Sequence, residues 1–162
     1  MPMRGPAGAR GPRTAPLERE CRLVQHGVSG VRILGDVREQ VSLYERAGGM
    51  AYFEALVAAF YRGVATDDLL RPMYPEEELE PATRRLTLFL AQYWGGPRTY
   101  DEERGHPRLR QRHFPFAIDP SARDRWLVLM RSAMVEVGTP PEVAAELDRY
   151  FALAAEAMRN QD

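Results

Sequence analysis

From Ser42 onward, apolar residues recur at spacings of three and four, the period that places side chains on one face of an α-helix. The clearest run consists of Phe53, Leu56, Val57, Phe60 and Val64. A shorter helix over residues 43–47 is predicted before it, and Gly48 and Gly49 would let the chain turn sharply between the two. The pattern therefore predicts two helices that pack tightly at their junction.

Capping and helix-breaking residues mark the connection that follows. Asp67 and Asp68 offer side-chain oxygens that can cap a short turn. Tyr74 precedes Pro75, and because a residue before proline avoids the helical region, the turn is predicted to end there. Tyr74 is therefore expected in a loop.

A third periodic segment passes through Ala82, Leu86, Phe89, Leu90 and Tyr93. The sequence Gly95-Gly96-Pro97 ends it, since glycine favours helix termini and proline cannot continue a helix. Residues 98–105 show no periodicity and are predicted to form a polar loop. A short helical segment is expected to begin at Pro107, a favoured first helical position, and to end at Pro115.

Two further helices complete the chain. Asp119 before Pro120 is the signature of a helix start, and Gly138 is predicted to end that helix. Its apolar face includes Trp126, Met130, Ala133 and Val137. Thr139, with Glu142 three residues later, fits a capping box that opens the last helix. The inward positions of that helix are Val143, Leu147, Phe151, Ala154 and Met158. All the periodic segments are helical, so the predicted fold class is all-α.

The first forty residues differ in character from the rest. Gly, Pro and Arg crowd residues 4–16, a composition without enough apolar content to order itself. Residues 1–40 are therefore predicted to be a disordered or weakly ordered extension of a domain that spans 41–162. Residues 23–34 could form a weak strand or hairpin, and translation starting near Val41 is an open alternative. No apolar h-region follows the basic stretch, so secretion is not supported.

Composition narrows the classes of function. The 162 residues include 44% hydrophobic and 28% charged side chains and no apolar run long enough to span a membrane, which predicts one soluble domain with a core. The net charge of -1 provides no overall field that would favour nucleic acid. The chain has no Lys, which excludes Schiff-base chemistry on the protein. Cys21 is the only cysteine, so an internal disulfide is excluded and a reducing, cytoplasmic setting is favoured.

His113 is the most informative candidate for chemistry. It ends the cationic string HPRLRQRH, and nearby cations disfavour imidazolium, leaving the neutral form that binds metals. Leu109 and Phe116 would make its surroundings apolar. Spacing alone favours a solvated or core histidine, and the cationic and apolar neighbours make a ligand to haem iron the alternative.

Several strings in this sequence resemble the second group of truncated haemoglobins. They are FYRGV at 60–64, MYPEEEL at 73–79, YWGGPRTY at 93–100, GHPRLRQRHFPF at 105–116 and RDRWL at 123–127. The resemblance covers residues 42–162 and is closest to bacterial, actinobacterial-like members. It implies a two-over-two helical sandwich around haem b, in which the proximal helix of larger globins is reduced to a loop and a short turn.

The resemblance also implies roles for individual residues. His113 would be the proximal iron ligand, and Tyr61, Tyr74 and Trp126 would donate hydrogen bonds to the bound ligand. Ala82 would occupy the distal-helix position, too small to donate or to block access, with Leu86 and Phe89 as an apolar wall. The side chains that would bind the haem propionates are Arg85, Tyr100, His106 and Arg110.

Three classes of function remain open on these grounds. The first is a haem protein that binds dioxygen, carbon monoxide or nitric oxide for transport, storage or sensing. The second is a redox enzyme that uses the same haem and a reductase for nitric oxide dioxygenation or peroxide reduction. The third is a helical interaction module without a cofactor. The arginine cluster over 104–112 only weakly suggests nucleic acid, because three carboxylates directly precede it. A homodimer is expected from the family resemblance.

Overall fold

The computed structural model of the protein describes residues 41–75 and 77–162, and over these residues every regular element is helical. The prediction of an all-α fold is therefore confirmed. The predictions for residues 1–40, including the extension and the weak strand, lie outside the described residues. In chain order the α-helices are α2 (Leu43–Ala47), α3 (Gly49–Ala65), α4 (Glu80–Tyr93), α5 (Thr99–Arg104), α6 (Leu109–His113), α7 (Pro120–Glu136) and α8 (Pro141–Met158), with a 3-10 turn, η1 (Arg71–Met73), before α4.

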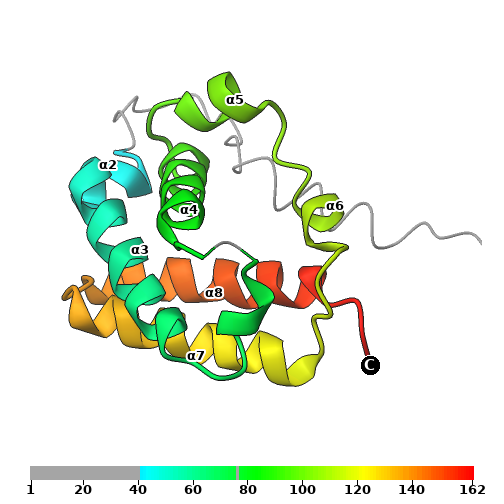
Figure 1. Ribbon diagram of the computed structural model, residues 1–162. Helices are drawn as coiled ribbons and strands as arrows, with labels where there is room; N and C mark the ends of the chain where they lie inside the picture. The colour runs from blue at the N-terminus through cyan, green and yellow to red at the C-terminus, as the bar shows by residue number, and fades with distance from the viewer. Residues whose placement is uncertain (1–40, 76) are drawn as a thin grey trace, which may run out of the picture.

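Four long helices form two layers. The helices α7 and α8 run beside each other, and α3 and α4 lie across them (Figure 1). The largest fully buried side chains come from both layers: Phe53, Leu56 and Phe60 from α3, Leu90 from α4, Met130 from α7 and Leu147 and Phe151 from α8. Burying this apolar area drives the layers together. Among the described residues, no helix is long and apolar enough to cross a membrane.

The junction between α2 and α3 matches its prediction. The helix α2 is capped by Ser42, whose hydroxyl accepts the Glu45 backbone N–H while the Glu45 carboxylate accepts the Ser42 N–H. Gly48 ends it with a φ of 114°, in the left-handed region where glycine has no steric cost. The chain thus turns directly from one helix into the next.

Close approach explains the glycines that end α4. A Cβ at Gly96 would lie 2.6 Å from the Tyr44 ring and 2.8 Å from the Ala91 carbonyl oxygen. Only glycine therefore lets this turn pack against α2, where the Tyr44 N–H donates to the Trp94 carbonyl at 3.0 Å. The predicted helix-breaking role of this segment is also its packing role.

Caps predicted at Asp67 and Asp119 are present, whereas Asp68 accepts no hydrogen bond within the described residues. The Asp67 carboxylate accepts the N–H groups of Leu69 and Leu70, at 3.1 and 2.9 Å. At the start of α7, the Asp119 carboxylate accepts the Ala122 N–H at 2.8 Å and the Ser121 hydroxyl at 2.7 Å. These bonds favour the ionised carboxylate and lower the pKa of Asp119.

Three local predictions are wrong. Residues 98–105 are not a loop, because α5 occupies most of that segment; the buried Tyr100 and a hydrogen bond from the Asp101 N–H to the Gln92 side chain dock it on α4. The short helix α6 begins at Leu109 rather than at Pro107. A helix of about one turn is too short to show a period, so tertiary contacts decide its position.

The third wrong prediction is the capping box at Thr139. The Thr139 hydroxyl is instead hydrogen-bonded to the Tyr52 hydroxyl of α3 at 2.8 Å, and α8 starts after Pro140 with no side-chain cap. A tertiary contact has taken the oxygen that the local motif would have used. The predicted α7 helix extends two residues too far, since the helix ends at Glu136 and Gly138 follows with a φ of 67°.

Candidate functional site

A cavity of about 550 Å³ lies between the two layers, and residues of α5 and α6 also line it. Its walls are mainly apolar, and a volume of this size suits a small-molecule or cofactor site. The apolar lining includes Leu70, Met73, Leu86, Phe89, Leu90, Phe116, Ile118, Phe151, Ala154 and Met158. Side chains with polar groups interrupt this apolar lining, which suits a mostly apolar group with a polar edge.

His113 lines the cavity from the last position of α6. Its Nδ1 lies 2.7 Å from the carbonyl oxygen of Leu109, one turn earlier on the same helix. A carbonyl can only accept, so Nδ1 must carry the proton, and in neutral imidazole Nε2 is then left with a free lone pair. A backbone carbonyl that orients one nitrogen while the other binds metal is the usual arrangement for a ligating histidine.

Three hydroxyl or indole donors from separate elements line the same cavity. Tyr61 comes from α3, Tyr74 follows η1 and Trp126 comes from α7. The rings of Tyr61 and Tyr74 meet edge to face with centroids 5.5 Å apart. Phe60 contacts both Tyr61 and Trp126, with centroids 5.0 and 5.2 Å apart. The aromatic cluster therefore fixes the three predicted donors within one wall.

The predicted apolar positions of α4 lie beside these donors. Ala82, in the first turn, is 3% exposed and lines the cavity, as do Leu86 and Phe89 on the following turns. Phe89 packs edge to face on Tyr100 of α5, with centroids 5.6 Å apart. The methyl side chain of Ala82 offers no hydrogen-bond donor to the cavity, unlike a histidine or glutamine.

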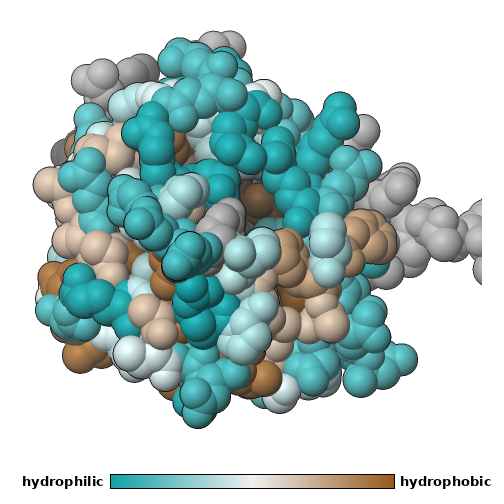
Figure 2. All heavy atoms as spheres, in the orientation of Figure 1, coloured by the Kyte–Doolittle hydropathy of each residue, from teal (hydrophilic) through white to brown (hydrophobic). Residues whose placement is uncertain are grey.

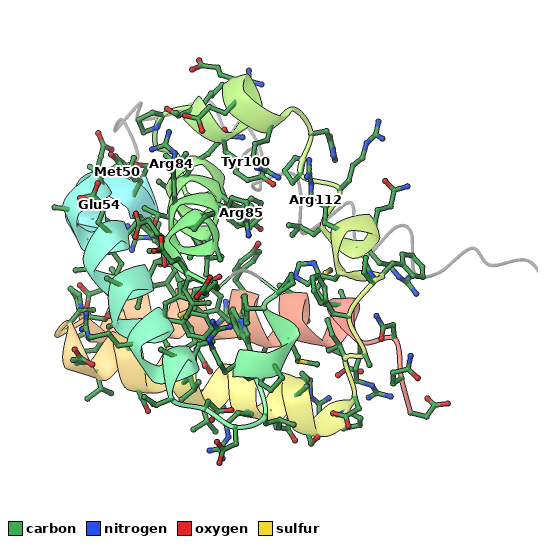
Figure 3. The ribbon with its side chains drawn as sticks, viewed as in Figure 1. Met50, Glu54, Arg84, Arg85, Tyr100 and Arg112 are labelled. Carbon is green, nitrogen blue, oxygen red and sulfur yellow. The ribbon has the colours of Figure 1, made fainter. Side chains whose placement is uncertain are left out.

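Arginines gather at the polar edge of the cavity. Arg85 of α4, Tyr100 of α5 and Arg112 of α6 approach the same region from three helices (Figure 3). Arg104 and Arg123 also line the cavity. Figure 2 shows hydrophilic side chains over the α5 part of this face and apolar atoms deeper between them. An edge rich in guanidinium groups suits carboxylates, which arginine binds in bidentate geometry.

Two predicted residues lie away from this edge. Arg110 and His106 are exposed and do not line the cavity; His106 Nδ1 instead accepts the Arg108 N–H at 3.2 Å. Arg112 of the same string does line the cavity, and its side chain donates hydrogen bonds from Nε to the Pro107 carbonyl and from Nη2 to the Arg104 carbonyl. The sequence shows arginine at alternate positions in this string, but only the rotation of α6 decides which one faces inward.

Sequence reasoning also missed Arg123 and Tyr150, which both line the cavity. Arg123 forms hydrogen-bonded ion pairs with Asp124 and Glu156, and these bonds raise the pKa of its guanidinium above the ordinary value. The residue stands one turn from the helix start within RDRWL, so helical spacing from Trp126 could have indicated it. Tyr150 stacks on Tyr93, with centroids 4.2 Å apart, which ties α8 to α4 behind the cavity.

Comparisons with known proteins agree with this geometry. Residues 42–160 match the bacterial-like globin family, so the chain belongs to that family, whose members bind haem. It is a globin of the truncated kind, a haem protein that binds oxygen.

Individual proteins of known sequence or structure are similar to this chain over most of their length. The chain is 43% identical over 113 residues to group 2 truncated haemoglobin YjbI of Bacillus subtilis, covering 70% of this chain and 85% of that protein. The X-ray structure of a thermostable haemoglobin from the actinobacterium Thermobifida fusca is 55% identical, with a TM-score of 0.72, and the match covers 74% of this chain and 98% of that one. The haemoglobin of Chloroflexus aurantiacus is 48% identical, with a TM-score of 0.73 and coverage of 75% and 100%. The resemblance to group II truncated haemoglobins is thereby confirmed.

Proposed function

We propose that this globin holds haem b and reversibly binds dioxygen, carbon monoxide and nitric oxide, with His113 as the iron ligand. One observation carries the proposal: a single cavity brings the oriented imidazole of His113 together with the donors Tyr61, Tyr74 and Trp126. When bound, haem supplies an iron atom that coordinates a diatomic ligand.

The chain itself supplies orientation, polarity and exclusion of water. The Leu109 carbonyl keeps the proton on Nδ1 of His113, so that Nε2 stays available. The hydroxyl and indole N–H groups lie in a mostly apolar cavity, where a hydrogen bond to a ligand that gains negative charge is stronger than in water. Arg85, Tyr100 and Arg112 are proposed to meet the propionates, in place of Arg110 and His106.

A second function uses the same site. Three donors around one ligand would slow the release of dioxygen, and slow release suits oxidation of nitric oxide to nitrate better than bulk transport. In its ferric state, the same haem could instead reduce peroxides. Either reaction would need a reductase as electron donor. We place this protein in the cytoplasm and expect a homodimer, on the basis of its single cysteine and its family.

Absorption spectra of the purified chain test the proposal, compared with the variants His113→Ala and His106→Ala. His106 is a matched control because it lies seven residues earlier, outside the cavity lining. The wild-type chain and His106→Ala should show a Soret band that shifts on reduction and on addition of carbon monoxide. His113→Ala should lose haem or change its ligation. No Soret band after haem addition to the wild-type chain would refute the proposal.

A further inference from the structure

The residues that follow α8 are hydrogen-bonded to the segment that follows His113. The Asn160 side-chain amide donates to the carbonyl oxygens of Phe116, at 2.8 Å, and His113, at 3.3 Å. Its carbonyl oxygen accepts the Ile118 N–H at 3.0 Å. The backbone N–H groups of Asn160 and Gln161 both donate to the Ile118 carbonyl at 3.1 Å. Five hydrogen bonds thus join two segments more than forty residues apart in sequence.

The helix that carries His113 depends on contacts with other parts of the chain. The helix α6 has five residues, none of them buried, and a helix this short is not stable in water without tertiary contacts. Arg108, directly before it, adopts a φ of 43°, a strained conformation for a residue with a side chain. The position of α6 therefore depends on contacts from the rest of the fold, and α8 and its extension provide them.

We propose that Asn160 is a positioning residue for the proximal histidine: its side-chain amide fixes the backbone from His113 to Ile118, and so sets where the imidazole lies. The proposal rests on the function proposed above, since His113 must be the iron ligand for this fixing to matter. It extends the proximal side of the site to the C-terminal end of the chain.

The chemistry of the amide explains why asparagine suits this place. One side of the amide donates to two carbonyl oxygens and the other accepts an N–H, so donor and acceptor are both needed. A carboxylate can only accept and would place a negative charge against the oxygens of His113 and Phe116. The exposed Gln161 uses its backbone N–H here, and no hydrogen bond of its side chain is found within the described residues.

The test compares Asn160→Asp with Gln161→Glu, which make the same change of amide to carboxylate at adjacent positions. The first readout is the rate at which haem leaves each full-length holoprotein for excess apomyoglobin. Asn160→Asp should lose haem several-fold to about tenfold faster than wild type, the effect of losing about one net hydrogen bond between partly buried groups. Gln161→Glu should stay close to wild type.

The second readout is the iron–histidine stretching band of the ferrous, ligand-free protein, measured by resonance Raman. In Asn160→Asp this band should shift or broaden as the imidazole takes several orientations, and a change confined to overall stability would not move it. Asn160→Ala, which removes both the donor and the acceptor of the side chain without adding a charge, should act in the same direction. It replaces Asn160→Asp if that variant does not fold.

The third readout needs no haem. Hydrogen exchange of peptides covering residues 109–118 in the full chain as purified should be faster in Asn160→Asp and unchanged in Gln161→Glu. If the wild-type chain binds no haem, the proposed function fails, and this measurement still decides whether Asn160 fixes the segment. Equal haem loss, Raman bands and exchange in Asn160→Asp and Gln161→Glu would overturn the inference.

Discussion

Replacing Trp126 by phenylalanine isolates one hydrogen-bond donor in the cavity. The indole ring packs on Phe60 and Phe151, with centroids 5.2 and 5.6 Å away. A phenyl ring at the same position keeps most of these ring contacts and removes the N–H. Haem should therefore be retained while the stabilisation of bound dioxygen falls.

The size of the effect follows from the kind of bond removed. A hydrogen bond to a charged acceptor contributes about 1.5–3 kcal/mol, and about 1.4 kcal/mol corresponds to a tenfold change in an equilibrium constant. The dioxygen dissociation rate should accordingly rise by about tenfold to a hundredfold. Tyr61 and Tyr74 remain in the cavity and can partly replace the lost donor, so the lower end of this range is expected.

Stopped-flow mixing of the dioxygen-loaded protein with excess carbon monoxide measures that rate. The matched control is Trp94→Phe, the same change at the other tryptophan. Trp94 does not line the cavity, and its buried indole N–H has no hydrogen-bond partner among the described residues. Its replacement should leave the rate unchanged. An unchanged rate in Trp126→Phe, or an equal rise in both variants, would refute the donor role of Trp126.

Two further predictions concern the cavity edge and the start of α7. Arg85→Gln should release haem to apomyoglobin up to about fivefold faster, because an exposed ion pair contributes up to about 1 kcal/mol. The control is Arg84→Gln, at a residue that pairs with Glu103 outside the cavity, and its haem release should match wild type. Equal rates in the two variants would show that Arg85 does not bind a propionate. Asp119→Ala should lower the Tm at pH 7, because it removes the acceptor for Ala122 and Ser121. The Asp119 pKa is lowered in the folded state, so its stabilisation is present above the ordinary aspartate pKa and lost as the pH falls through the folded value. The Tm difference from wild type should therefore shrink in acid, and a difference constant from pH 7 to pH 2 would contradict this cause.

Much of the fold could be predicted because its long helices are amphipathic over several turns. A period of three and four residues repeated in α3, α4 and α8 shows which face is apolar without any knowledge of the partner. Asp67, Asp119 and the glycines at 48 and 95–96 act within a few residues of themselves, so their effects also follow from local chemistry. The string around His113 and the aromatic residues of the cavity were found through resemblance, since spacing alone favoured a solvated or core histidine.

Contacts between segments far apart in sequence decided the rest. The short helices α5 and α6 have too few residues to show a period, so tyrosine burial and hydrogen bonds to other helices set where they begin and which way they face. The rotation of α6 places Arg112 rather than Arg110 at the cavity. The Thr139 hydroxyl is hydrogen-bonded to Tyr52 of α3 and does not form the predicted capping box.

The sequence by itself determined the helical class and the long helices, because these depend on periodicity and local capping, whereas the residues of the haem site were indicated by the family resemblance. Only the tertiary structure decided which arginines face the cavity and how the segment after His113 is held. Asn160 is the clearest case, since nothing within several residues of it in sequence indicates a partner at His113. A hydrogen bond across more than forty residues exists only once α8 has packed and brought the two segments within reach.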